Sequence, residues 1–228
     1  MIRPVINKSQ GGFLMKINGT NIFWIILFAV STAGIDFIVA PSLYPGRLPW
    51  LIAGFDSLIM LLIGFSGVIL IRYTKTPFLF YNDDDPKESK KSWLLLLLLS
   101  MLLIALNAVI WYNSKEQIQS IGWVKSLTPI NSILISIRAG ITEEVIFRFF
   151  LFSLLLLVFA KIIHSKILIF LICSIISALA FAFLLHSGSI VSLVAGIILS
   201  YIYYKKGLLP AIIVHFLGDF IPFLMISI

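Results

Sequence analysis

Residues 167–185 read ILIFLICSIISALAFAFLL, an apolar run that contains no charged residue. A helix that crosses a bilayer needs about 20 mostly apolar residues, so this run alone is long enough to span a membrane. The whole chain is 60% hydrophobic and 12% charged, whereas a soluble domain is about 45–50% apolar and about 25% charged. Because a soluble protein of this size must cover its surface with polar groups, the composition excludes a soluble domain and predicts a membrane protein.

Further apolar segments lie on both sides of this run, and together they predict an all-α, polytopic transmembrane helical bundle of about six to eight spans. The predicted spans are 22–40, 50–71, 93–112, 130–160, 167–185, 190–204 and 208–228. The fourth is too long for one straight span, so we expect it to begin with an interfacial helix that is capped near Thr128. The sixth is short, which is typical of a re-entrant or strongly mismatched helix.

The net charge of +7 also fits a membrane protein. Basic residues in inner loops and anionic lipid headgroups account for such a charge. The lysines and arginines are scattered over short loops and form no stripe with interleaved aromatic residues, so the bilayer is the expected partner and nucleic acid is not. They are concentrated in the segments on the same side as the N-terminus, which predicts that the N-terminus is inside.

Charged residues inside the predicted spans are the next informative feature, because each costs roughly 2.5–3.5 kcal/mol at the bilayer centre. Asp36 and Asp56 are each the only charged residue in their span. For both we predict a structural role, in which the carboxylate hydrogen-bonds a neighbouring helix.

The fourth span contains three charged residues within Gly140-Ile141-Thr142-Glu143-Glu144-Val145-Ile146-Phe147-Arg148. Glu144 and Arg148 are four residues apart, so they share a helix face and can form an ion pair. This pairing leaves Glu143, about 100° around the helix, without a local partner. A carboxylate in a dry, polar-lined cavity can act as a general base near neutral pH.

Two histidines also lie in or beside apolar segments. His186 ends the fifth segment, and His215 lies in the last one, four residues before Asp219. A single intramembrane histidine usually bridges helices, but here two glutamates, two histidines and an aspartate occur on three separate spans. From the residues alone, catalysis and an ion or proton pathway remain equally open.

The three groups resemble the motifs of the CPBP family, the type II CAAX prenyl protease and bacteriocin-processing (Abi-type) intramembrane peptidases. Glu143-Glu144-x-x-x-Arg148 and His215-x-x-x-Asp219 match the first and last motifs without a break. The middle motif is Phe-x-x-x-His in the family, but here Ala182 stands four residues before His186. The resemblance covers roughly 140–220 and implies a catalytic core (129–228) preceded by variable transmembrane helices and loops (22–128). Residues 1–21 are polar for a signal peptide and are predicted to be a retained tail.

The resemblance implies hydrolysis of a peptide bond within the membrane by an activated water. Glu143 and His186 would activate the water, and Glu144 with Arg148 would hold the site in shape. His215 and Asp219 would stabilise the oxyanion or bind a metal. If a metal such as zinc is present, its ligands come from Glu143, His186, His215 and Asp219, and metal-assisted and metal-free mechanisms remain equally open.

Seven straight spans would place His186 near the outer end of the fifth helix and His215 nearer the inner end of the seventh. A shared site then requires the fifth helix to run past His186, or the sixth to be re-entrant. An ionised aspartate cannot donate a hydrogen bond to an oxyanion, so Asp219 is protonated, orients His215, or binds a metal.

Two other classes of protein remain as alternatives: a proton or cation carrier that uses the same carboxylates, and a non-catalytic immunity or scaffold protein with the peptidase fold. For a peptidase, the resemblance implies a bacterial cell-membrane location. A prenylated tail, a leader or pheromone peptide and a regulatory membrane protein are all compatible substrates.

Overall fold

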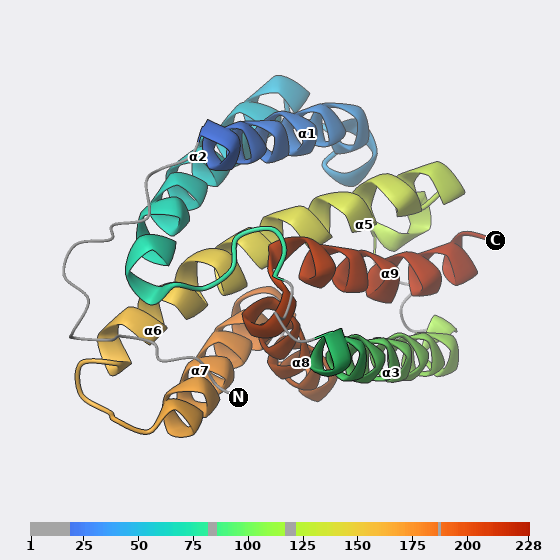
Figure 1. Ribbon diagram of the computed structural model, residues 1–228. Helices are drawn as coiled ribbons and strands as arrows, with labels where there is room; N and C mark the ends of the chain where they lie inside the picture. The colour runs from blue at the N-terminus through green and yellow to red at the C-terminus, as the bar shows by residue number, and fades with distance from the viewer. Residues whose placement is uncertain (1–18, 82–85, 117–121, 187) are drawn as a thin grey trace. The chain divides into compact units, whose positions relative to one another are not determined.

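The computed structural model describes residues 19–81, 86–116, 122–186 and 188–228, and these ranges are largely helical (Figure 1). The long helices are α1 (Gly19–Leu43), α2 (Pro49–Thr74), α3 (Pro86–Asn113), α5 (Pro129–Glu144), α7 (Lys166–Leu185), α8 (Ile190–Lys206) and α9 (Leu208–Ser227). The shorter elements are a 3-10 turn, η1 (Val124–Ser126), a π-helical segment, η2 (Val145–Phe152), and α6 (Ser153–Phe159). The predicted tail, 1–21, lies outside the described residues except at its end, where α1 begins.

Five of these helices are long and apolar enough to cross a membrane: α1, α2, Lys90–Asn113 of α3, α7 and α9. The prediction of a polytopic helical membrane protein is therefore confirmed. The helix bounds agree closely with the predicted segments, and α8, the predicted short span, is shorter than these five. The last residue of α8 is Lys206, and Gly207 caps it with a φ of 100°, a backbone conformation that favours glycine.

The fourth predicted segment is a single helical run in which α5, η2 and α6 follow one another without a break. Its start is as predicted, because the Thr128 hydroxyl accepts a hydrogen bond from the Asn131 amide at 3.2 Å and Pro129 is the first helical residue. The run changes to a π-helix directly after Glu144. Such segments are rare and frequently occur at functional sites.

The structure divides into two compact units, and the first contains η2, α6, α7 and α8, together with the second half of α2 and the start of α1. Within it, α7 packs against α8 and both contact η2. The helices approach closely where Gly196 of α8 meets Ala178 of α7, because a Cβ built on Gly196 would lie 2.7 Å from the Cβ of Ala178. Small residues allow such an approach between membrane helices.

Gly196→Ala is therefore expected to destabilise the protein by roughly 1–3 kcal/mol, because the added methyl group overlaps Ala178. Thermal unfolding can be followed through the reaction of Cys173, the only cysteine, which is buried, with a thiol-reactive dye. The double variant Gly196→Ala/Ala178→Gly should recover little of the loss, because the added Cβ would still lie 2.9 Å from the Cα of residue 178 and a glycine inside a helix is itself destabilising. Gly54→Ala is the matched control, since nothing lies within 4 Å of a Cβ at that position; an equal loss in Gly54→Ala would contradict the overlap.

The C-terminal end of η2 is held against α8 in the same unit. The Ser153 hydroxyl lies 3.0 Å from the Tyr203 hydroxyl, and both residues are buried. The ring of Phe152 packs edge-on against the ring of Tyr203, with 6.0 Å between centroids. These contacts fix the helix beyond the π-helical segment.

The second unit contains the remainder of α1, the first half of α2, α3, most of α5 and most of α9. Arg138 of α5 forms ion pairs with both Asp36 of α1 and Asp56 of α2. The prediction that these aspartates bond a neighbouring helix is confirmed, and their common partner is the arginine. On its other side α5 approaches α9, because a Cβ on Gly140 would lie 3.1 Å from the carbonyl oxygen of Ile212.

Candidate active site

Glu143 and His186 come together in the first unit, although they are far apart in the sequence. The Oε2 atom of Glu143 lies 3.3 Å from the Nε2 atom of His186. Their side chains are 16% and 31% exposed, respectively, so the pair is partly open without lying on an exposed surface. A carboxylate and an imidazole in contact can share the tasks of taking up and returning a proton.

His186 is placed by the way α7 ends. The amides of His186 and Gly188 both donate to the carbonyl of Ala182, at 3.1 Å and 2.9 Å. His186 is thus the capping residue of α7, which occupies the predicted range and does not continue past the histidine. A fifth helix that continues past His186 is one of the two predicted ways to bring His186 and His215 to the same depth. That prediction is wrong, because α7 ends at Leu185.

Phe181 supplies the aromatic contact that the family motif would place at position 182, where this sequence has an alanine. Its ring lies 4.5 Å, centroid to centroid, from the imidazole of His186. The guanidinium carbon of Arg148 lies 4.4 Å from the centroid of the same ring. The motif therefore shifts by one position, and Phe181 packs between a site histidine and the buried arginine.

Glu144 and Arg148 form the predicted ion pair, with 3.0 Å between Oε1 and Nη1. Both side chains are fully buried. The pair contrasts with the partly exposed Glu143, one residue away on the chain. Glu144 and Arg148 are thus closed to solvent, whereas part of the Glu143 side chain is open.

Ser177 of α7 makes a contact that was not predicted from the sequence. Its hydroxyl donates to the carbonyl of Phe147, within the π-helical segment, at 2.7 Å. Ser177, Ser174 and Ala178 are all buried, so α7 presents small residues to the interior of this unit. In the sequence, the sign of this contact is the spacing of small residues, three and four apart, within the apolar run.

Ser177→Ala is expected to destabilise the protein by about 1 kcal/mol, because it removes a buried hydrogen bond to the π-helical segment. Ser174→Ala is the matched control: Ser174 is on the same helix and fully buried, and its hydroxyl has no hydrogen-bond partner among the described residues. Thermal unfolding of the two variants checks the difference. Equal losses would mean that the Ser177 hydrogen bond adds nothing to stability.

His215 and Asp219 form the third pair, in the part of α9 that belongs to the second unit. The Nε2 atom of His215 lies 3.4 Å from the Oδ2 atom of Asp219. The histidine is 4% exposed and the aspartate 20% exposed. Beside them, the carbonyl of Gly218 accepts a hydrogen bond from Asn107 of α3 at 2.6 Å, which ties α9 to α3.

A metal site needs three or four donor atoms in one place. Among the described residues, no three His, Cys, Asp or Glu side chains are gathered in that way. The two pairs, Glu143 with His186 and His215 with Asp219, each offer two of the four proposed ligands. Neither pair by itself therefore supplies enough ligands for a metal ion.

The fold is that of an integral membrane protein in which a partly exposed glutamate and histidine are in contact. Residues 125–221 match the family described as type II CAAX prenyl endopeptidase Rce1-like. The match confirms the resemblance drawn from the three motifs, over the part of the chain that carries them. It contains all six candidate site residues, whereas α1, α2 and α3 lie outside it. The comparisons with curated proteins and with solved structures give no match.

Proposed function

We propose that this protein is an intramembrane endopeptidase in which Glu143 and His186 activate the attacking water. The observation that carries the proposal is the contact between these two side chains, which are partly exposed, whereas the neighbouring pair of Glu144 and Arg148 is fully buried. The family match supports peptide hydrolysis as the reaction. It does not by itself assign roles to individual residues.

In the proposed reaction, the carboxylate of Glu143 takes a proton from a bound water, and the resulting hydroxide attacks the carbonyl carbon of the scissile peptide. His186, 3.3 Å from the carboxylate, orients the water and holds the proton-bearing group in place. The tetrahedral intermediate then collapses, the carbon–nitrogen bond breaks, and the proton moves to the departing amine. One water is consumed, and a carboxylate and an amine are released.

The role that we propose for His215 and Asp219 is stabilisation of the oxyanion. The carboxylate of Asp219 faces Nε2 of His215, which supports an orienting role for the aspartate among the three roles left open by the sequence. A positioned histidine can donate to the developing negative charge. Cleavage measured with and without a strong metal chelator distinguishes this role from metal binding: unchanged activity favours the oxyanion role.

The substrate class to test first is a prenylated protein tail, because the matching family is described as a prenyl endopeptidase. Leader or pheromone peptides and regulatory membrane proteins are the other candidates. Comparative peptidomics of cells that carry the wild-type protein or the Glu143→Gln variant would identify the substrate from its uncleaved form. Identical peptide profiles would contradict the proposed activity.

The same variant separates the other two classes of protein. A carrier would show pH-dependent ion flux in liposomes that is lost with Glu143, and a non-catalytic scaffold would keep its cellular effect without Glu143, His186 or His215. Cleavage that depends on Glu143, without flux, is the result that the peptidase predicts.

A further inference from the structure

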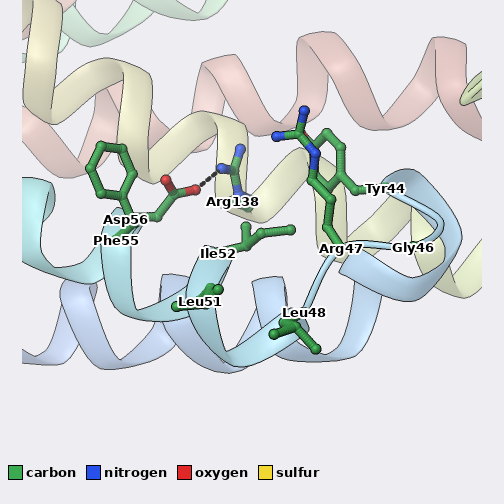
Figure 2. A pocket seen from close by; sticks show the side chains of 9 residues that line it. All are labelled: Tyr44, Gly46, Arg47, Leu48, Leu51, Ile52, Phe55, Asp56 and Arg138. Atoms are coloured by element: carbon green, nitrogen blue, oxygen red, sulfur yellow. Dashed lines mark hydrogen bonds and ion pairs between the residues drawn. The ribbon is translucent and has the colours of Figure 1, made fainter.

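A groove of about 630 Å³ lies in the second unit, beside the turn that joins α1 to α2 (Figure 2). Its volume is in the range of sites that hold small molecules, about 300–1,000 Å³. Its lining is mostly apolar, with charged groups at two points. The lining residues are Tyr44, Gly46, Arg47, Leu48, Leu51, Ile52, Phe55, Asp56 and Arg138.

The turn beside the groove lies at the ends of two helices that are each long enough to cross a membrane. The end of such a helix pair lies at the level of the lipid headgroups. Tyr44 and Trp50, which flank the turn, are 39% and 59% exposed, and tyrosine and tryptophan are enriched at this level of the bilayer. The mouth of the groove is therefore expected among the headgroups, with its wall extending toward the acyl chains.

Arg47 is held at the mouth by an ordered turn. The amide of Arg47 donates to the carbonyl of Tyr44 at 3.1 Å, and Gly46 has a φ of 85°. With Pro45 before the glycine, these features are typical of a type II turn. Within the ranges that the structure describes, no hydrogen bond or ion pair engages the guanidinium of Arg47, which Figure 2 shows beside Tyr44.

Arg138 is the second polar group, and Figure 2 shows it beside Asp56. Its Nε atom bonds Asp36 and its Nη2 atom bonds Asp56. The side chain is still 25% exposed, and no described side chain bonds its Nη1 atom. The two carboxylates more than balance the charge of the one guanidinium, so this point of the groove offers an N–H donor but no positive charge. Among the described lining residues, Arg47 at the mouth is therefore the cation that has no ion-pair partner.

The apolar part of the groove is accessible. Leu48, Leu51 and Phe55 are 52%, 51% and 64% exposed. The groove thus presents a cation at its mouth, apolar side chains and an N–H donor. A phospholipid carries matching groups in its anionic phosphate, its acyl chains and its ester carbonyls.

We propose that this groove binds a single phospholipid, with the phosphate on Arg47, an ester carbonyl toward Arg138, and an acyl chain along Leu48, Leu51 and Phe55. The bound lipid connects the α1–α2 turn to α5 within the second unit. The groove shares no residue with the candidate active site, and lipid binding there does not depend on peptide hydrolysis.

The test is native mass spectrometry of the purified full chain with phosphatidylglycerol or with diacylglycerol that has the same acyl chains. We expect the phospholipid to bind about tenfold more tightly than diacylglycerol, and Arg47→Gln to lose about tenfold in phospholipid affinity, the loss expected for one charge-assisted hydrogen bond. Arg47→Lys should retain most of the affinity. Lys161→Gln, which removes the same charge from an exposed position in the other unit, should bind as the wild type does.

Equal binding of phospholipid and diacylglycerol, or wild-type binding by Arg47→Gln, would overturn the proposal. Binding of inorganic phosphate as tight as that of phospholipid would also overturn the proposal, because the ligand would then be a free anion. Leu51→Ser should weaken both lipids, and wild-type lipid binding by this variant would remove the acyl-chain contact from the proposal. Thermal unfolding through Cys173 verifies that each variant is folded before binding is measured.

Discussion

Glu143→Gln is expected to lower the rate of peptide-bond cleavage by about 10²–10⁴-fold, the usual contribution of a general base. Glutamine has nearly the same size and can still hydrogen-bond His186 across the 3.3 Å contact, so the site should keep its shape. It cannot accept a proton from water, so only the chemical step is lost. The measurement is the cleavage rate of a substrate identified by peptidomics, with the variant and wild type in the same lipid.

The matched control for this prediction is Glu116→Gln. It makes the same chemical change at an exposed position shortly after the end of α3. This variant should cleave at the wild-type rate. Thermal unfolding should show that both variants are folded. Undiminished cleavage by a folded Glu143→Gln protein would remove Glu143 from the mechanism, and with it the proposed water activation.

Arg148→Met is expected to have the largest effect on stability, a loss of about 3–5 kcal/mol. The substitution removes the guanidinium from a fully buried ion pair and leaves the Glu144 carboxylate buried without its positive partner. It also removes the contact of the guanidinium with the ring of Phe181. Because both residues are sealed from water, solvent cannot replace the lost interaction.

The double variant Glu144→Gln/Arg148→Met separates the ion pair from its surroundings. Replacing both charges of a buried pair often costs little, so the double variant should be more stable than Arg148→Met alone. Lys161→Met, at an exposed position, is the control and should unfold close to the wild-type temperature. If Arg148→Met is as stable as the wild type, the pair does not hold the site in shape.

The membrane-spanning helices could be predicted closely from the sequence, because the length of an apolar run and the thickness of the bilayer determine them almost without reference to other parts of the chain. The pairs Glu144–Arg148 and His215–Asp219 could be predicted for a similar reason. Residues four apart on a helix are neighbours through local backbone geometry alone. The hydrogen bond that starts α5 at Thr128 is equally local.

Contacts between distant segments needed the tertiary structure. Arg138 was not recognised as the partner of Asp36 and Asp56, because three helices must pack before one arginine reaches both carboxylates. The π-helical segment after Glu144 has no simple sequence pattern, and the Ser177 hydroxyl that bonds it comes from another helix. Phe181 replaces the missing aromatic at position 182 because the end of α7 turns His186 back onto its ring.

The sequence by itself therefore determined that this is a helical membrane protein with acidic, arginine and histidine side chains on particular spans. Those properties depend on hydrophobicity and on spacing along one helix. Only the tertiary structure decided that Glu143 meets His186, and that this pair is partly exposed while Glu144 and Arg148 are fully buried. Both depend on how α7 and the π-helical segment pack, which no single stretch of sequence specifies.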